Sequence, residues 1–291
     1  MCDKRFKPLP DGDFARVFAD ELTEVEQRQK SRFPTQITSA NVVQQANADV
    51  QPYLAKICRR LLLDGSGLKG LEHLDALERL AIAGNSCLVA LNHRSNLDVP
   101  TLFALLEDEG RADLFARMIG ISGRKLLEDA GATWMLAQAF NRVIVSPRSW
   151  LSEEHTDEEL HAAHLINIAA HRAIHELRHQ GWIFALFPSA TRMRPRDESS
   201  GRAIEETDSY LKNFEYLVLG RIDGCTLPVT RDHDLTHETP VLDRVRYTFG
   251  PVLRTAEWRQ SAAERYPALD QRAASARAIM EDIAALEPGA A

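Results

Sequence analysis

A histidine and an aspartate stand five positions apart in the segment Asn92-His93-Arg94-Ser95-Asn96-Leu97-Asp98. On a straight helix this spacing leaves two side chains about 140° apart, and on a strand it puts them on opposite faces, so they can meet only across a turn. A carboxylate that holds one ring nitrogen of a histidine leaves the other nitrogen to abstract a proton. The pair therefore predicts a general base with an orienting acid. The alternative is a loop histidine beside an aspartate that only caps a helix.

The residues around the pair predict the turn that this chemistry needs. Residues 86–91 are apolar or small and carry no charge, which indicates a short buried strand. Pro100 is tolerated in the first turn of a helix but not in its interior, so a helix is expected to begin near Asp98. His93 is then expected just ahead of a helix N-terminus.

Two arginines follow a second apolar strand, predicted at residues 182–187. Arg192 and Arg194 lie in a loop that Pro188 and Pro195 stiffen on either side. This loop therefore presents two guanidinium groups just past the end of a predicted strand.

Together the two loops resemble the phospholipid acyltransferases, above all the soluble glycerol-3-phosphate acyltransferases of the plastid type. That family carries an N-H-x4-D block and later a P-S-G-G-R-x-R-P block, which residues 92–98 and 188–195 match. Residues 140–148 resemble the family's second block, residues 227–229 resemble its short proline block, and the four stand in the family's order. The chain departs from the pattern at Ala190 and Thr191, where the family has two glycines, and at Arg148-Ser149, where the plastid enzymes have two basic groups.

The resemblance implies transfer of a fatty acyl group to the sn-1 hydroxyl of glycerol 3-phosphate, with acyl-CoA or acyl carrier protein as donor. It implies that His93 is the base, that Asp98 orients it, and that Arg148, Arg192 and Arg194 hold the phosphate. No cofactor and no metal are expected. Two alternatives stay open: an acyltransferase acting on lysophosphatidate or another phosphorylated alcohol, and a non-catalytic module that binds lipid or phosphate.

Composition narrows the class of protein. The chain has 291 residues, 44% of them hydrophobic, and a formal net charge of −7. Nucleic acid or permanent binding to anionic membranes would need a basic face, so at most transient membrane contact is expected. No stretch approaches the roughly 20 apolar residues of a membrane span, and no secretory signal is recognisable. Four widely spaced cysteines favour free thiols, and hence the cytoplasm.

The periodicity of apolar residues predicts a small helical N-terminal domain at residues 1–84 and an α/β domain at residues 85–291 with a largely parallel mixed sheet and flanking helices. Residues 13–84 are expected to be helical throughout, in segments 14–30, 41–63 and 71–83, and residues 259–286 to form one surface helix. Ligands bind beyond the carboxyl ends of parallel strands, where His93 and the three arginines are expected. The strands are predicted at residues 86–91, 114–119, 142–146, 182–187, 225–229 and 246–250.

One motif favours a different chemistry. His175-Glu176-Leu177-Arg178-His179 matches the H-E-x-x-H pattern of zinc peptidases. It lies in a predicted helix that begins with a capping box at Thr156 and Glu159 and ends before Gly181. At about 100° per residue, the histidines of this helix fall in a stripe roughly 80° wide, opposite its apolar face. They are therefore expected to face solvent, which disfavours a catalytic zinc site.

Overall fold

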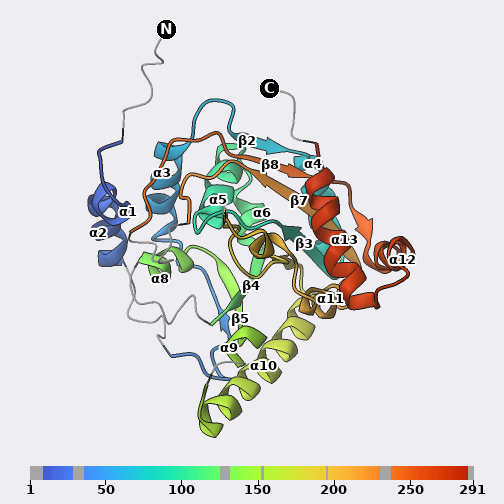
Figure 1. The fold of residues 1–291 in the computed structure, drawn as a ribbon. Helices are drawn as coiled ribbons and strands as arrows, with labels where there is room; N and C mark the ends of the chain where they lie inside the picture. Colours follow the sequence, from blue (N-terminus) through green and yellow to red (C-terminus); the bar gives the residue numbers. More distant parts are fainter. Residues whose placement is uncertain are drawn as a thin grey trace.

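The computed structural model describes residues 9–28, 36–124, 132–151, 154–194, 196–229 and 237–287. It shows an α/β fold in which helices cover both faces of a mixed, mostly parallel sheet, with an N-terminal helical region (Figure 1). The fold class expected from the sequence is confirmed.

The strands run in the order β1-β5-β4-β6-β3-β7-β8-β2, and β9 pairs with β7. The inner strands β5, β4, β6, β3 and β7 are parallel to one another, whereas β1, β8 and β9 pair antiparallel with their neighbours. The bounds are β1 Val43–Gln44, β2 Gly67–Lys69, β3 Cys87–Leu91, β4 Met118–Gly123, β5 Asn141–Val145, β6 Ile183–Leu186, β7 Tyr216–Asp223, β8 Arg246–Phe249 and β9 Leu253–Arg254.

β3 lies between β6 and β7, and all five of its residues are buried. Cys87, Val89 and Leu91 belong to one hydrophobic core, and Leu88 and Ala90 belong to the other. Successive side chains of a strand point to opposite faces, so a strand covered on both faces is apolar throughout. This double burial accounts for the uncharged run that precedes His93.

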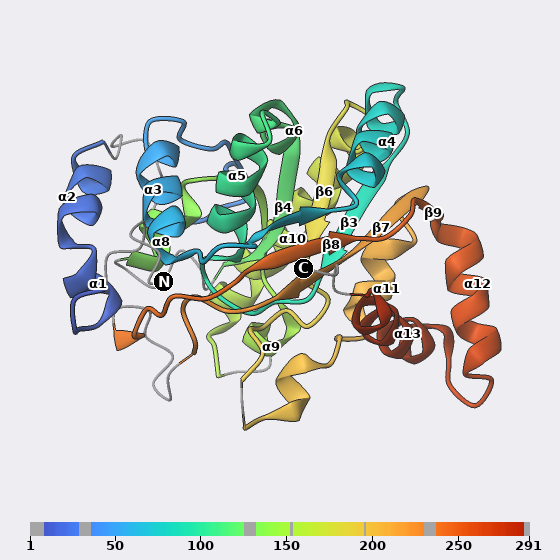
Figure 2. The same ribbon diagram turned by 90° about the horizontal axis from the view of Figure 1, so that it is seen from above.

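Two groups of helices cover the sheet. One core packs side chains of the helices from α1 to α8 against it, and the other packs those of α10 to α13 (Figure 2). The first group comprises α1 Phe14–Val17, α2 Ala19–Arg28, α3 Gln51–Leu61, α4 Leu71–Ile82, α5 Asp98–Asp108, α6 Ala112–Ala116 and α8 Ala132–Ala137. The remaining helices are α9 Arg148–Leu151, α10 Asp157–Leu177, η1 Glu198–Gly201, α11 Glu206–Leu211, α12 Thr255–Arg265 and α13 Gln271–Ala285.

Two predicted strands are wrong in position. Leu114 and Phe115 belong to α6, and the strand predicted at residues 114–119 begins only at Met118. Residues 225–229 form no strand; the strand is β7, which ends at Asp223 ahead of Gly224, a glycine with φ of 85°. Leu227 is fully buried although it lies in a loop, so the apolar run reflected burial and not an extended conformation.

The ends of the chain also differ from expectation. The region predicted to be helical throughout contributes β1 and β2 to the sheet, and β2 pairs with β8 from the other end of the chain. The observed helices α1 to α4 cover only part of the three predicted helical segments, and Lys30 lies outside the described residues. The single helix expected at residues 259–286 is two helices, α12 and α13, separated by Pro267, which ends a helix because it cannot donate its backbone hydrogen bond.

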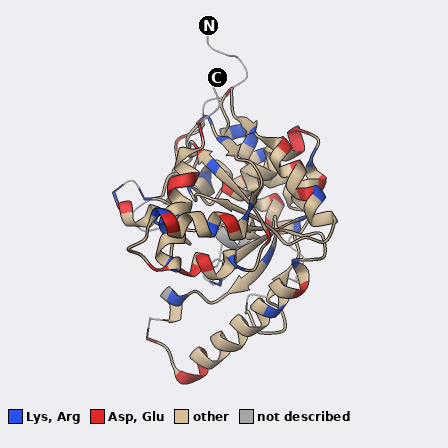
Figure 3. Cartoon of the chain, turned by 90° about the vertical axis from the view of Figure 1, so that its right-hand side faces the viewer, with Lys and Arg blue, Asp and Glu red and all other residues tan. Residues whose placement is uncertain are grey.

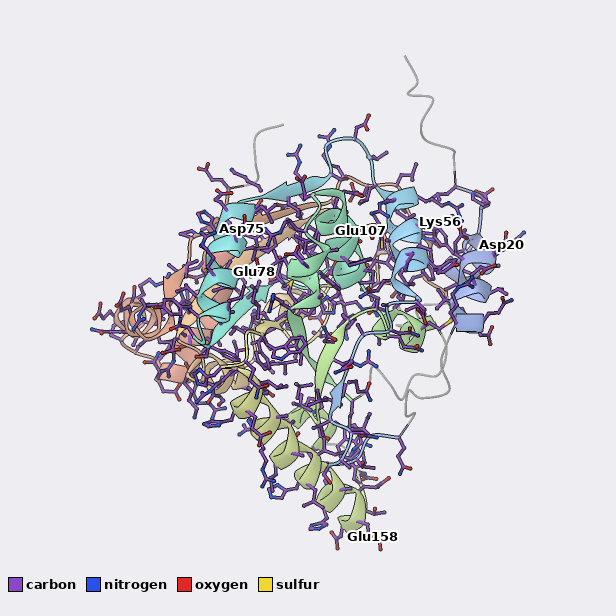
Figure 4. All side chains as sticks on the ribbon, turned by 180° about the vertical axis from the view of Figure 1, so that it is seen from behind. Asp20, Lys56, Asp75, Glu78, Glu107 and Glu158 are labelled. Atoms are coloured by element: carbon purple, nitrogen blue, oxygen red, sulfur yellow. The ribbon has the colours of Figure 1, made fainter. Side chains whose placement is uncertain are left out.

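Ion pairs connect neighbouring surface helices. Asp75 and Glu78 of α4, labelled in Figure 4, both bind Arg111 at the start of α6. In Figure 3, acidic and basic residues are interspersed along the helices. Among the described residues, no helix combines the length and the apolar character that crossing a membrane requires.

Candidate active site

The loop after β3 is clamped to the neighbouring strand by Asn92. Its side-chain nitrogen donates a 3.0 Å hydrogen bond to the carbonyl of Ile222, and its side-chain oxygen accepts a 2.7 Å bond from the Ile222 amide. Both atoms are buried, so the pair satisfies one edge of β7 beyond its ladder with β3. The backbone that carries His93 is thereby held to the sheet.

His93 and Asp98 meet across the turn that the spacing predicted. The Nδ1 atom of His93 lies 2.9 Å from Oδ2 of Asp98, and that oxygen also accepts bonds from the amides of Arg94 at 2.7 Å and Ser95 at 3.0 Å. A carboxylate oxygen that already accepts two N–H groups favours a proton on Nδ1 of His93, which leaves Nε2 as the acceptor. This is the arrangement that a general base requires.

Asp98 does not cap α5. It is the first residue of that helix, and the preceding residue, Leu97, forms no side-chain cap bond. The Asp98 carboxylate instead binds the two amides upstream of the helix, and it is only 5% exposed. The alternative of a simple capping aspartate therefore does not fit this geometry.

Two aromatic residues that the sequence did not single out complete the setting of the pair. The ring of Phe187 stacks on that of His93 with centroids 4.1 Å apart. The Tyr247 hydroxyl donates a 2.6 Å hydrogen bond to the backbone carbonyl of Asp98, and burial, together with the negative charge of Asp98, raises the Tyr247 pKa well above its ordinary value. Tyr247 therefore remains a protonated donor that holds the first turn of α5.

The loop after β6 lies beside the histidine loop because β6 pairs with β3. The amide of Met193 donates a 2.8 Å hydrogen bond to the carbonyl of His93, which joins the two loops directly. Arg192 forms an ion pair with the buried Glu238, and Arg194 lies 3.5 Å from Asp197. Pro195, part of the predicted stiffening, lies outside the described residues.

Arg148 occupies a more open position. It begins α9, after β5, and three strand spacings separate β5 from β3 in the sheet. Its Nε atom lies 2.9 Å from Oε1 of Glu206, and 70% of its side chain is exposed. The sequence predicted one phosphate site from Arg148, Arg192 and Arg194. In the structure, Arg192 and Arg194 follow the strand next to β3, and Arg148 follows a more distant strand.

The five predicted residues all line one cavity of about 950 Å³. His93, Asp98, Arg148, Arg192 and Arg194 all line it. Its other lining is largely apolar, with Leu102, Phe115, Met118, Leu136 and Phe140 among these residues. Residues of α10 and α11 from the other group of helices, such as Asn167 and Tyr210, also line it. Pockets of roughly 300–1,000 Å³ with apolar walls and a few convergent polar groups are typical ligand sites.

Ala190 holds an unusual backbone conformation at this cavity. Its φ is 53°, and no other non-glycine residue among those that the structure describes has a positive φ. Its amide donates a 2.9 Å bond to the carbonyl of Phe187, which closes the turn after β6. A glycine adopts this conformation without strain, so the alanine at position 190, where the resembled family has glycine, carries a cost in conformational free energy.

The histidines of α10 are exposed, as expected, but His171 also lines the cavity and stacks on Tyr210. His179 lies beyond the end of α10, and its Nδ1 atom is 2.9 Å from the carbonyl of Gly84. His161, His164, His171 and His175 are exposed, whereas Ala163, Ile166, Ala170, Ala173 and Ile174 are buried. The capping box at Thr156 and Glu159 is present, and Glu158 in the same first turn points away from the sheet in Figure 4. Over the described part of the chain, no group of three or more His, Cys, Asp and Glu side chains is arranged to hold a metal ion.

The cysteines near the site are thiols. Cys58, Cys87 and Cys225 are free, and Cys2 lies outside the described residues. Burial raises the pKa of Cys225 to about 11, and its Sγ atom lies 3.6 Å from the carbonyl of Arg94. At neutral pH it is therefore a protonated thiol and a poor nucleophile.

The fold and the site define an α/β protein with a histidine–aspartate pair at the carboxyl end of a central parallel strand. A family model described as Acyltransferase matches residues 68–215, about half of the chain, and this range contains all five predicted site residues. The chain therefore belongs to the Acyltransferase family, within the phospholipid and glycerol acyltransferases, and this family implies an acyl donor and an acceptor. No curated protein matches the chain.

Proposed function

We propose that the protein transfers a fatty acyl group from an acyl thioester, acyl-CoA or acyl carrier protein, to the sn-1 hydroxyl of glycerol 3-phosphate. The observation that carries this proposal is the cavity that His93 and Asp98 share with Arg192 and Arg194. A base and two cations that line one cavity suit an acceptor that carries both a hydroxyl and a phosphate. The apolar part of the wall suits a fatty acyl chain.

The chemistry follows from the positions of these groups. Nε2 of His93 takes the proton of the acceptor hydroxyl as its oxygen attacks the thioester carbonyl, and the C–S bond then breaks. The imidazolium returns the proton to the leaving thiolate, so the products are an ester and a thiol. Asp98 stabilises the imidazolium without taking the proton. General acid–base catalysis of this kind contributes about 10²–10⁴-fold in rate.

Arg192 and Arg194 bind the phosphate of the acceptor in this proposal, and Arg148 supplies a third positive charge further along the cavity. Charge-assisted hydrogen bonds from a guanidinium group contribute about 1.5–3 kcal/mol each. A phosphate held in this way fixes the hydroxyl near His93, because only a short carbon backbone separates the two groups in glycerol 3-phosphate. We place the reaction in the cytoplasm, in keeping with the free thiols Cys58, Cys87 and Cys225.

A matrix of donors and acceptors with the purified protein tests the proposal. Initial rates of thiol release are measured for acyl-CoA and acyl carrier protein, each with glycerol 3-phosphate, lysophosphatidate or no acceptor. We expect release that depends on glycerol 3-phosphate and that falls by at least about 10²-fold in His93→Ala, with an unchanged melting temperature. Near-normal turnover of a folded His93→Ala protein would show that His93 is not the base.

The acceptor is a separate question from the reaction. Thr191-Arg192 matches part of the Glu-Gly-Thr-Arg form found in enzymes that act on lysophosphatidate, whereas the paired arginines match the glycerol-3-phosphate enzymes. A kcat/KM for lysophosphatidate that equals or exceeds that for glycerol 3-phosphate would change the acceptor and keep the acyl transfer. Release of thiol at the same rate without any acceptor would reject transfer altogether.

A further inference from the structure

Arg192 is held from behind by a carboxylate that lies far away in the sequence. Its Nη1 atom forms a charge-assisted hydrogen bond with Oε1 of Glu238, 46 residues further along the chain. The Glu238 side chain is completely buried, whereas 13% of the Arg192 side chain is exposed at the cavity that it lines. The carboxylate thus sits behind the cavity wall and the guanidinium group forms part of that wall.

Backbone hydrogen bonds extend this contact in two directions. The amide of Phe14, the first residue of α1, donates a 2.8 Å bond to the carbonyl of Glu238. On the other side, Met193, the residue after Arg192, donates its amide to the carbonyl of His93 at 2.8 Å. The start of α1, Glu238, the arginine loop and the histidine loop are therefore joined in one continuous chain of contacts.

We propose that Glu238 is a positioning residue that orients the guanidinium group of Arg192 for the anionic group of the acceptor. A guanidinium group carries five N–H donors in one rigid plane, so a bond to one nitrogen restricts the directions in which the others can point. Because Nη1 is bound to a buried carboxylate, the guanidinium plane of Arg192 is oriented before the acceptor binds. The acceptor then does not have to immobilise a side chain that is otherwise rich in rotamers.

This inference rests on the proposed function, since it assigns to Arg192 an anionic acceptor. Orientation and simple charge compensation predict opposite signs when Glu238 is neutralised. If the carboxylate only lowers the positive charge of the site, removing it will strengthen the binding of a phosphate. If it orients Arg192, removing it will weaken the binding in spite of the added positive charge.

The test uses Glu238→Gln and Glu238→Ala in the full chain. Isothermal titration calorimetry measures binding of glycerol 3-phosphate and of inorganic phosphate without any donor, and kinetics measures the KM for acyl-CoA. We expect anion binding to weaken about threefold in E238Q, where a neutral amide oxygen still accepts the bond, and about tenfold or more in E238A. The KM for acyl-CoA should stay within about twofold of the wild-type value, because Arg192 is assigned to the phosphate of the acceptor and not to the donor.

Glu21→Gln is the matched control. Glu21 of α2 is a buried carboxylate that binds Arg60 at 2.7 Å and Lys56 of α3 at 3.4 Å, in the helical region labelled by Asp20 and Lys56 in Figure 4. Its neutralisation also removes a buried negative charge, but at a site that contributes nothing to the cavity. We expect E21Q to lower the melting temperature and to leave anion binding unchanged.

Anion binding in both Glu238 variants that equals or exceeds that of the wild type would overturn the inference, as would an equal loss for donor and acceptor. If E238A does not fold, the sign of the change in E238Q decides. The two proposals fail in different ways. If the wild type binds phosphate more tightly than the Glu238 variants but transfers no acyl group, the proposed reaction is rejected and the positioning role is supported. If the wild type binds neither glycerol 3-phosphate nor inorganic phosphate, both proposals are overturned.

Discussion

The negative charge of Asp98 can be tested apart from its geometry. Its Oδ2 atom faces three donors, namely Nδ1 of His93 and the amides of Arg94 and Ser95. An asparagine at this position would turn its oxygen toward the same donors, so the proton would remain on Nδ1. The substitution then removes the charge that stabilises the imidazolium and leaves the tautomer unchanged.

We expect Asp98→Asn to lower kcat by about 10²-fold while the melting temperature changes little. Steady-state kinetics and thermal unfolding of the same preparation measure the two quantities. A variant that loses stability but keeps its rate would return Asp98 to a purely structural role.

Replacing Ala190 is predicted to stabilise the protein. A non-glycine residue in the left-handed region costs roughly 1–2 kcal/mol, and the greater freedom of glycine in the unfolded chain costs about 0.4–1 kcal/mol. We therefore expect Ala190→Gly to stabilise the protein by about 0.5–1 kcal/mol, measured by urea unfolding. Ala203, which lies in the same region of the chain outside the left-handed conformation, is the control, and Ala203→Gly should bring no gain. Destabilisation by A190G would show that the turn carries no strain.

At the scale of elements, the parallel pairing of β3 with β6 decides which loops meet. Because their carboxyl ends share one edge of the sheet, the histidine loop and the arginine loop come into contact through Met193 and His93. Each arginine of that loop has a different setting. Arg192 is tied to a buried carboxylate, whereas Arg194 is 40% exposed and its nearest carboxylate lies 3.5 Å away.

Arg194→Ala is therefore the cleaner test of phosphate binding by this loop. We expect the acceptor KM to rise by about tenfold or more and the donor KM to stay unchanged, with little loss of stability because the side chain is only weakly paired. Arg196→Ala is the matched control, an exposed arginine two positions on that we do not assign to the phosphate. Equal effects on both substrates would remove Arg194 from the acceptor site.

At the scale of the whole molecule, the N-terminal helices and the sheet share one core. Phe14 of α1 and Val89 of β3 belong to the same cluster of buried residues, and β2 adds an edge strand next to β8. A proposed boundary near residue 84 thus separates segments that pack together. The fold therefore predicts that the two regions unfold as one unit.

Phe14→Ala tests this expectation. Phe14 is fully buried, so its truncation should cost about 3–5 kcal/mol of the free energy of unfolding. We expect a single unfolding transition in the wild type and in the variant, with coincident loss of the near- and far-ultraviolet circular dichroism. Two separate transitions, with only the first shifted by F14A, would instead support an independent N-terminal domain.

The sequence by itself determined the features that depend on neighbours along the chain. The uncharged run before His93, the turn to Asp98 and the capping box of α10 each involve residues within a few positions, so residue type and spacing specify them. The resemblance to acyltransferases rested on such local blocks, and the match over residues 68–215 confirmed the family. The identity of the five candidate residues came from the same source.

The tertiary structure alone decided which distant groups support them. Tyr247 reaches the carbonyl of Asp98 across 149 positions, and Asn92 binds Ile222 across 130. Glu238 lies in a loop whose local sequence carries no sign of its pairing with Arg192. Apolar runs such as residues 225–229 misled for a related reason, because burial in a loop and burial in a strand select the same residue types. The order of strands brings these partners together, and strand order depends on packing between segments that the spacing of residues along the chain does not encode.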